Sequence, residues 1–300
     1  MKILITGGAG FVGYHLTKEL LGLKHQVYIL DDLSTGYKRN VLKKAKFLED
    51  SILNEKIISK YVKKCDLIFH LAAKVELQKS IINPEECLEV NLVGTAILVK
   101  YCYKFKKRLV FASSCSVYPN NIEKKLSENI ILDPTTPYSV SKAAGENLIN
   151  FYSKNFFLNS VILRFFNIYG ERQNVKSEYA AVIPKFIDNA IKNKQLKLFG
   201  HGKQSRDFIN VKDVVDAYIK LGFSNKKGVF NVGSGESTTI KELANMIIKK
   251  ASKGRIKNLP SLEGDAKFSC ANINKIKSAI NYSPKISLGE GLDNLIKRKL

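Results

Sequence analysis

The chain opens on a short apolar run that is broken by three spaced glycines. Residues 3–13 read Ile-Leu-Ile-Thr-Gly-Gly-Ala-Gly-Phe-Val-Gly, so that Gly7, Gly10 and Gly13 recur at intervals of three. An apolar run that ends at glycine predicts a buried strand, and the amphipathic stretch 11–21 that follows it predicts a helix. The pattern therefore predicts a strand, a tight turn and a helix in direct succession.

A turn of this kind is suited to hold a phosphate group. A helix N-terminus offers unpaired N–H groups and the positive end of the helix dipole, and glycine lets a pyrophosphate come close. Asp31 ends the next apolar run, residues 27–30, where a carboxylate accepts the hydroxyls of an adenine ribose and repels a 2′-phosphate. The sequence therefore predicts an NAD site. Plain turn geometry and a solvated loop acid are the alternatives, and Asp32 fits the latter.

Apolar runs and helical patterns alternate along the first half of the chain. Strand-like runs occupy residues 2–6, 26–30, 46–48, 67–71, 108–113 and 161–165. Helical patterns lie between them, notably at residues 54–63, 84–105 and 138–155. Such alternation builds a parallel sheet with helices on both faces, and ligands bind at the carboxyl ends of its strands. One strand ends in the small residues 71–73, which suit a flat ligand ring or tight packing equally well, and His70 before them fits a buried core histidine.

Beyond Phe165 the alternation fades. Residues 167–210 and 233–300 predict short helices and loops, while residues 211–223 and 229–232 predict a helix and a strand that return to the sheet. We therefore expect an α/β fold, a Rossmann-type doubly wound parallel sheet with a smaller discontinuous C-terminal substrate lobe. The expected domains are residues 1–166 with the return segment 211–232, and a lobe made of residues 167–210 and 233–300.

Bulk composition excludes several classes of protein. With 300 residues and 45% hydrophobic side chains, the chain can bury a sizeable core. Gly7 interrupts the first apolar run too early for a signal peptide, and no run is long enough to span a bilayer, so we expect a cytoplasmic protein. The five cysteines are odd in number and lack CxxC spacing, which argues against a disulfide framework and against a metal site.

The net charge of +22 is the one bulk property that could indicate nucleic-acid binding. The lysines are spread in ones and twos, however, without an arginine-rich stripe interleaved with aromatic residues. We therefore expect a solvated basic surface, with no nucleic-acid partner and no membrane partner. Its positive field would also draw a diphosphate-bearing substrate toward the protein.

Three polar residues point to oxidation and reduction of an alcohol. Ser114 follows a predicted strand, and Tyr138 precedes Lys142 by four residues, so that both project from one face of a helix. A nearby ammonium and a positive nicotinamide ring favour the phenolate of Tyr138, which can take a proton from a sugar hydroxyl while hydride leaves the same carbon. Ser114 would hydrogen-bond the same oxygen. A Tyr-x-x-x-Lys pair alone is frequent on surface helices, but the glycine turn and the serine favour the catalytic interpretation.

Together these motifs resemble the extended short-chain dehydrogenase/reductases, and within them the NAD-dependent nucleotide-sugar epimerases. The resemblance covers essentially the whole chain and implies an enzyme similar to UDP-glucose or UDP-N-acetylglucosamine 4-epimerases. Its motifs are residues 6–13, 31–36, 70–73, 113–118, 138–142, 164–170, 206–208 and 231–233.

The resemblance also implies which residues contact the ligands. It implies that NAD contacts Gly7, Gly10, Phe11, Val12, Gly13, Asp31, Asp32, Ser34, Thr35, Gly36, Asp50, Ser51, Leu71, Ala72, Ala73, Asn91, Ser113, Tyr138, Lys142 and Phe165. It implies that the nucleotide sugar contacts Ser114, Asn167, Val182, Arg206, Asp265 and Ser269. Among these, Asp50 would meet the adenine, Asn91 would lie along the cofactor, and Phe165 would border the nicotinamide. Asn167 and Arg206 would hold the diphosphate, because a guanidinium can fork two phosphate oxygens; a surface ion pair between Arg206 and its neighbouring aspartate is the alternative.

The resemblance narrows the expected reaction. The 4,6-dehydratases of the family carry an Asp-Glu pair beside the catalytic serine or threonine, and this chain has Cys115 and Ser116 there. Decarboxylating relatives use a glutamate after that serine and an arginine in the C-terminal lobe, and neither is evident. The expected reaction is therefore oxidation at C4, rotation of the 4-keto sugar and return of hydride to its opposite face. It would interconvert UDP-GlcNAc and UDP-GalNAc, or UDP-Glc and UDP-Gal, and leave NAD regenerated and bound.

The identity of the sugar stays open at this point. Residues 178–184 resemble the matching region of epimerases that accept N-acetylated UDP-sugars, and the small Ser269, at the position that gates sugar size, leaves room for a 2-acetamido group. Leu262 replaces the family's usual arginine, which removes one cationic contact to the diphosphate and costs on the order of a few kcal/mol unless a residue such as Lys267 compensates.

Other functions remain as alternatives. The chain could be another NAD-dependent nucleotide-sugar enzyme, namely a dehydrogenase, a reductase or a uronate epimerase. It could also be a catalytically silent NAD-binding protein, or a nucleic-acid-binding protein that keeps the fold. Relatives are commonly homodimers, and we expect the same here through the helices predicted at residues 84–105 and 138–155.

Overall fold

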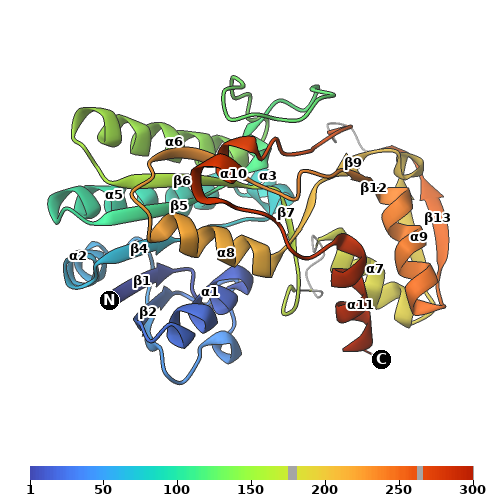
Figure 1. The fold of residues 1–300 in the computed structure, drawn as a ribbon, viewed down its shortest axis with the longest axis horizontal. Coiled ribbons are helices and arrows are strands. Elements are labelled where there is room, and N and C mark those ends of the chain that lie inside the picture. Colours follow the sequence, from blue (N-terminus) through green and yellow to red (C-terminus); the bar gives the residue numbers. More distant parts are fainter. Residues whose placement is uncertain (175–180, 262–265, 300) are drawn as a thin grey trace. The chain divides into compact units, whose positions relative to one another are not determined.

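The computed structural model describes residues 1–174, 181–261 and 266–299, which divide into two compact units (Figure 1). Unit 1 comprises Met1–Val117, Leu132–Arg164 and Val215–Phe230, and unit 2 comprises Tyr118–Ile131, Phe165–Val214 and Asn231–Leu300. The sequence placed residues 118–131 in the N-terminal domain, whereas the structure groups them with unit 2. The reason is a β-bridge between Leu126 and Ala271, which ties this segment to the C-terminal part of the chain.

A seven-stranded parallel sheet forms the centre of the first unit (Figure 1). Its order is β11-β6-β5-β4-β1-β2-β3. The strands are β1 (Lys2–Thr6), β2 (Gln26–Asp31), β3 (Lys46–Glu49), β4 (Leu67–His70), β5 (Arg108–Ser114), β6 (Ser160–Phe165) and β11 (Gly228–Val232). The glycine-rich turn therefore follows a central strand, because β1 lies between β2 and β4 with Ile3 opposite both Val27 and Leu67. The expected strands, including the returning one, are confirmed with small differences at their ends.

Helices cover both faces of this sheet, so the doubly wound fold is confirmed. On one face, Leu4, Ile68 and Phe111 pack in a core cluster with α2 (Glu55–Lys64), α5 (Gly94–Lys104) and α6 (Pro137–Asn155). Alternate strand residues point to the opposite face. There the Phe69 ring meets Tyr218 of α8 (Val211–Gly222) edge to face at 5.7 Å, and α1 (Phe11–Gly22) buries Leu16 and Leu20.

Local sequence signals explain where α2 and α6 begin. Asn54 caps α2 by accepting the N–H of Ile57. Thr136 caps α6 by accepting the N–H of Ser139, while the Ser139 hydroxyl accepts the N–H of Thr136. Pro137 occupies the first helical position, where its missing N–H is not needed. This reciprocal capping fixes the first turn of α6.

The single helix expected at residues 84–105 is wrong in detail. The structure shows α4 (Pro84–Leu88), a π-helical turn η2 (Glu89–Val93) and then α5, and a further short helix, α3 (Leu77–Ile82), precedes them. The wide turn contains Asn91, whose side chain bonds to residues on other segments. A π-turn depends on such tertiary contacts, and the hydrophobic periodicity carries no signal for it.

Unit 2 contains more regular structure than the short helices and loops expected from its sequence. Its core cluster joins α7 (Val182–Ile191), α9 (Ile240–Ala251) and α11 (Leu288–Lys297). The remaining elements are the short helix α10 (Asn274–Ile280) and three two-stranded sheets, which pair β7 (Asn167–Tyr169) with β10 (Phe208–Asn210), β9 (Ser205–Arg206) with β12 (Thr238–Thr239), and β8 (Gln195–Phe199) with β13 (Arg255–Leu259). Capping boxes open α9 at Thr239/Glu242 and α11 at Ser287/Glu290, a signal that was present in the sequence.

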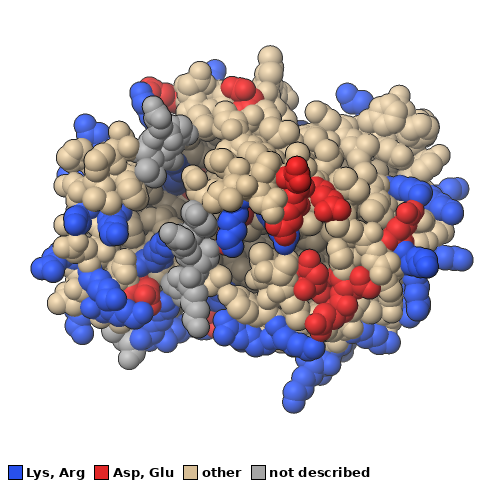
Figure 2. All heavy atoms as spheres, turned by 180° about the vertical axis from the view of Figure 1, so that it is seen from behind, with Lys and Arg blue, Asp and Glu red and all other residues tan. Residues whose placement is uncertain are grey.

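Charged side chains are widely distributed over the surface. Figure 2 shows Lys and Arg spread around one face, with smaller groups of Asp and Glu between them. Across the described parts of the chain, every helix is too short or too polar to cross a bilayer.

Candidate active site

The glycine-rich turn has a geometry that side chains would block. Gly7 has φ +73°, and a Cβ atom there would lie 2.6 Å from the backbone nitrogen of Ala72. A Cβ on Gly13 would lie 2.4 Å from the carbonyl oxygen of Gly7. Gly10 occupies the N-cap of α1, and Phe11 and Val12 are the first residues of that helix. The turn thus brings bare backbone to a helix N-terminus, which is a ready anion-binding site.

Asp31 is fixed against this turn. One carboxylate oxygen accepts the N–H of Ala9 at 3.0 Å, and the other accepts the N–H of Leu33 at 2.9 Å. Burial raises the pKa of the Asp31 carboxyl, and these two N–H donors oppose the rise. Gly36 is also required here, because a Cβ on it would lie 2.7 Å from the Asp31 carboxylate. Asp31 is therefore fixed beside the glycine turn, and its contact with the ribose of NAD remains a prediction.

The buried Asn40 completes this support, although it was missed in the sequence. Its side-chain amide donates to the carbonyl of Ala9 at 2.9 Å, so that Ala9 is held on both sides. Asparagine in a loop is common, and nothing in its spacing marked it. Asp32, by contrast, accepts from the N–H and the hydroxyl of Ser34 in a tight local turn, with Thr35 following.

Two further residues expected at the cofactor have structural partners. Asp50 accepts the N–H of Ser51 at 2.7 Å and the side-chain amide of Asn54 at 3.1 and 3.0 Å, next to the start of α2. Asn91 accepts the N–H of Lys74 at 2.7 Å and donates to the Ser141 hydroxyl at 3.0 Å. Their contacts with NAD remain predictions.

His70 is a structural residue, as the sequence indicated. Its ring nitrogens lie 2.8 Å from the Thr6 hydroxyl and 2.9 Å from the Thr95 hydroxyl. Burial lowers its pKa to about 3, which keeps the ring neutral. The N–H groups of Leu71 and Ala72 donate hydrogen bonds to Thr6, the last residue of β1. The residues that follow β4, with Ala73 next in the chain, are therefore held beside the glycine turn.

Ser114, Tyr138 and Lys142 come together within unit 1. Ser114 ends β5 and hydrogen-bonds the side chain of Tyr138, which lies in the first turn of α6. One turn later, the Lys142 ammonium lies 5.9 Å from the centre of the Tyr138 ring and donates to the carbonyl of Ala112 at 2.9 Å. A buried phenol and a buried ammonium thus lie beside a half-buried hydroxyl, and such a set of groups can serve proton transfer to and from an alcohol.

Burial dominates the electrostatics of this group. It raises the pKa of Tyr138 to about 12, although the Ser114 hydrogen bond opposes the rise. It lowers the pKa of Lys142 to about 8. The sequence predicts a lowered pKa for Tyr138 from a neighbouring ammonium, whereas the pKa is raised, because burial takes the phenolate out of water.

Ser113 was expected at the cofactor, but its side chain is used inside the fold. Its hydroxyl donates to the carboxylate of Glu146, which also pairs with Arg164. Phe165, the last residue of β6, is buried. Contacts of NAD with the backbone of Ser113 and with the ring of Phe165 remain predictions.

Three residues expected at the substrate gather around one strand segment of unit 2. The side chain of Arg206 donates to the carbonyls of Ser205 at 2.8 Å and Ala266 at 2.7 Å. Ser269 donates its backbone N–H to Ser205 at 3.2 Å, and Asn167 donates its side-chain amide to the carbonyl of Asp207 at 3.2 Å. The sequence therefore identified residues that the fold places together.

Asp207, which immediately follows Arg206, anchors this segment. It is fully buried, and its carboxylate accepts from the N–H groups of Ser234, Gly235 and Ala271 and from the Ser234 hydroxyl. Of the remaining expectations, Val182 begins α7 and packs against the core of unit 2. Asp265, Leu262 and residues 178–180 lie outside the described part of the chain.

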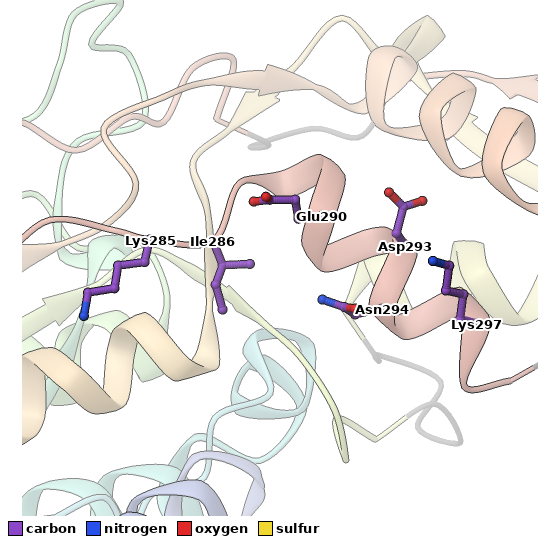
Figure 3. Close-up of a pocket in the computed structure, with 6 residues that line it drawn as sticks. All are labelled: Lys285, Ile286, Glu290, Asp293, Asn294 and Lys297. Atoms are coloured by element: carbon purple, nitrogen blue, oxygen red, sulfur yellow. The ribbon is translucent and has the colours of Figure 1, made fainter.

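The hollows of unit 2 lie elsewhere. A polar surface pocket of about 400 Å³ is lined by Lys285, Ile286, Glu290, Asp293, Asn294 and Lys297 (Figure 3). Its acids are engaged: Glu290 accepts from Ser287 at the cap of α11, and Asp293 pairs with Lys250 at 2.7 Å. A second pocket of about 240 Å³ is bordered by Pro184, Ile187 and Leu295 among others. Among the described residues, none of those expected at the substrate lines either pocket. Within the described ranges, His, Cys, Asp and Glu form no group of three suited to a metal ion.

Comparison with known proteins gives a consistent family. The model of the NAD dependent epimerase/dehydratase family matches residues 3–233. A putative UDP-glucose 4-epimerase of Methanocaldococcus jannaschii is 36% identical over 98% of this chain and 97% of its own length. The crystal structure of a UDP-glucose 4-epimerase of Thermotoga maritima with UDP-glucose has a TM-score of 0.95 at 30% identity, with 100% of this chain and 99% of that chain covered.

A third relative extends the range of sugars. The UDP-N-acetylglucosamine 4-epimerase of Methanobrevibacter ruminantium, in complex with UDP-N-acetylmuramic acid, has a TM-score of 0.95 at 32% identity, with 99% of this chain and 97% of that chain covered. The chain belongs to the NAD-dependent epimerase/dehydratase family, within the extended short-chain dehydrogenase/reductases.

Proposed function

We propose that the protein is an NAD-dependent nucleotide-sugar 4-epimerase that interconverts UDP-GlcNAc and UDP-GalNAc, or UDP-Glc and UDP-Gal, through a 4-keto intermediate. The observation that carries the proposal is the cluster of the half-buried Ser114 with the buried Tyr138 and Lys142. In place of the acidic pair of the dehydratases, the chain has Cys115 and Ser116, which cannot supply the acid and base for loss of water.

The glycine turn and Asp31 fit NAD. Gly7 and Gly13 let the backbone of the turn pack closely on itself and on Ala72, and backbone N–H groups fix both oxygens of Asp31. A helix N-terminus and a carboxylate would thus be available for the pyrophosphate and the ribose. When bound, NAD supplies the acceptor and the later donor of the hydride at C4. The protein itself binds and orients the reactants and moves the proton.

Tyr138 exchanges the proton of the C4 hydroxyl in this proposal. Ser114 donates a hydrogen bond to the same oxygen and holds it in line with the phenol. A positive charge on Lys142, 5.9 Å from the centre of the Tyr138 ring, favours the phenolate form in this proposal. Burial acts in the opposite direction and raises the pKa of Tyr138. After the 4-keto sugar has rotated in the site, Tyr138 returns the proton to the C4 oxygen. No added reductant is then needed.

The substrate side of the proposal rests on the cluster in unit 2. Arg206 carries a permanent charge and Asn167 a neutral amide, a combination suited to a diphosphate. The small Ser269 suits a sugar with a 2-acetamido group. Relatives whose names include UDP-glucose and UDP-N-acetylglucosamine support both candidate sugars.

We also propose a homodimer built from α5 and α6. Both helices expose large apolar side chains to solvent, among them Tyr103, Val140 and Phe151. Tyr103, Phe151, Tyr152 and Phe156 form one connected aromatic group on these helices. Sedimentation velocity should give a dimer at micromolar concentration, and a monomer under those conditions would refute this assembly.

The reaction is tested by incubating the purified protein with UDP-Glc, UDP-Gal, UDP-GlcNAc, UDP-GalNAc and UDP-glucuronic acid. We expect the 4-epimer of at least one of the first four to form without added NADH or NADPH, as resolved by chromatography and NMR. Tyr138→Phe should lower kcat by about 100-fold or more, because the proton acceptor is removed. Full turnover by Tyr138→Phe, or a need for stoichiometric reductant, would overturn the proposal.

A further inference from the structure

A buried carboxylate lies one helical turn beyond Lys142. Glu146 of α6 is 1% exposed and accepts from Arg164 of β6, with Nε at 2.9 and 3.1 Å and Nη2 at 2.6 Å. It also accepts from the hydroxyl of Ser113 at the end of β5. One carboxylate therefore joins the helix that carries Tyr138 and Lys142 to the strand end that carries Ser114.

The end of β5 is attached to α6 at three consecutive residues. The carbonyl of Ala112 accepts from Lys142, the hydroxyl of Ser113 donates to Glu146, and Ser114 hydrogen-bonds Tyr138. The middle attachment is the one made by a group outside the reacting set. Loss of that attachment would leave Ser114 free to shift relative to Tyr138.

Stability alone is a weak reason for such a pair. A buried ion pair loses much of its Coulomb attraction to desolvation, and an apolar pair of similar volume is often equally stable. A fixed geometry and a fixed charge are what an apolar pair cannot supply. Glu146 provides both next to Lys142.

We propose that Glu146, held by Arg164 and Ser113, is a positioning residue of the active site, which fixes Ser114 against Tyr138 and helps to keep Lys142 protonated. The first part rests on the proposed epimerase function. The second part concerns the charge of Lys142 and can be tested without any reaction.

The groups around Lys142 make the charge effect specific. Tyr138 and Glu146 face it from its own helix, Cys87 faces it from α4, and His70 faces it from β4. Burial lowers the pKa of Lys142, while Cys87 and Glu146 raise it. His70 is neutral, and Cys87 is a thiol whose own pKa is raised by burial. Glu146 is the carboxylate among these neighbours, and it pairs with Arg164.

The test is an NMR titration of the protein saturated with NAD and labelled at lysine Cε. Lys142 should titrate well below the surface lysines, and loss of its signal in Lys142→Gln assigns it. In Glu146→Gln we expect the midpoint of Lys142 to fall by about one pH unit, because a neighbouring negative charge is lost and Arg164 is left uncompensated. The double variant Glu146→Gln/Arg164→Met removes both charges and should bring the midpoint back toward that of the wild type.

A matched control uses an exposed ion pair. Glu55 accepts from Lys100 at 2.6 Å on the surface of unit 1, and Glu55→Gln should leave the Lys142 midpoint unchanged. An unchanged midpoint in Glu146→Gln, or an equal fall in Glu55→Gln, overturns the charge role. If Glu146 had only a structural role, Glu146→Gln would lower the melting temperature without changing the midpoint of the Lys142 titration.

Ser113→Ala tests the positioning role and keeps both charges, so it should fold normally. We expect kcat to fall by about 10-fold with KM little changed and the Lys142 midpoint intact, because only the alignment of Ser114 is loosened. Wild-type kcat in this variant contradicts the positioning role. If the wild type epimerises none of the sugars, the proposed function fails, whereas the lysine titration still decides the charge role.

Discussion

At the residue scale, burial destabilises the charged forms of two of the proposed catalytic residues. Tyr138 and Lys142 both have pKa values shifted toward the neutral state, to about 12 and about 8. The sequence identified both residues, since Tyr-x-x-x-Lys followed a glycine turn and a serine. It could not show the direction of the tyrosine shift, because that depends on how much protein surrounds the phenol.

The lysine shift predicts a pH dependence of stability. The pKa of Lys142 is about 8 in the folded protein and about 10.4 in an unfolded chain, so between these values the unfolded state holds more protons. The free energy of unfolding of the wild type, relative to Lys142→Met, should therefore rise from pH 8 to pH 10, by about 3 kcal/mol at most. Urea denaturation of both proteins at several pH values measures this difference.

The comparison with Lys142→Met removes the contributions common to both proteins. Among these is Tyr138, whose raised pKa has the opposite sign: its contribution is present below about pH 10 and is lost as the pH approaches 12. A relative stability that stays flat or falls between pH 8 and pH 10 would contradict a buried, destabilised ammonium.

Glycine-to-alanine substitutions can distinguish the role of the glycine turn from that of the helix α1 that follows it. Gly13→Ala places a Cβ 2.4 Å from the carbonyl oxygen of Gly7, so the turn must shift. We expect NAD affinity to fall by at least about 10-fold and the melting temperature to drop, as measured by calorimetric titration and thermal unfolding. Gly22→Ala, at the end of the same helix, meets no atom within 4 Å and should leave both values nearly unchanged. Equal NAD affinity in the two variants would show that the turn tolerates a side chain.

At the element scale, the sequence predicted strands better than helices. Every strand of the central sheet was found, because buried parallel strands are short apolar runs between turn residues. The π-turn at Glu89–Val93 was missed, since it depends on the contacts of Asn91 with Lys74 and Ser141. The ion pair of Glu146 and Arg164 was missed for a related reason: its members lie on different elements and look like ordinary surface charges in the sequence.

The capping box of α6 should matter for catalysis as well as for stability. Thr136→Ala removes the cap that fixes the first turn, in which Tyr138 lies. We expect a loss of about 1 kcal/mol in the free energy of unfolding and a several-fold lower kcat. Thr239→Ala removes the same motif from α9 of unit 2, which carries none of the reacting residues, and should lower stability similarly without lowering kcat. Denaturation and steady-state kinetics of both variants decide the matter; equal kcat losses would refute a local role of the α6 cap.

At the scale of the whole molecule, the excess of 49 basic over 27 acidic residues sets a long-range field. On the face shown in Figure 2 these residues are spread out, which fits the expected solvated basic surface. Charge alone could not identify the family; the ordered motifs did. The place of residues 118–131 in unit 2 was not predicted, because the β-bridge of Leu126 links segments far apart in the chain.

This field predicts a salt dependence of substrate capture. Salt shortens the reach of charge, from about 10 Å at 0.1 M to about 3 Å at 1 M. We expect KM for the nucleotide sugar to rise several-fold between these salt concentrations while kcat stays nearly constant. Steady-state kinetics in NaCl and in a second monovalent salt provide the measurement, and a KM independent of both salts would argue that the basic surface plays no part in capture.

The late position of β11 in the chain has a consequence for synthesis. The sheet of unit 1 ends in a strand at Gly228–Val232, and α8 just before it covers one face through Tyr218. A nascent chain that stops short of these residues presents β6 as a bare edge and leaves Phe69 uncovered, a surface prone to join other chains. During synthesis, the sheet of unit 1 can therefore be completed only after the ribosome has made most of the chain.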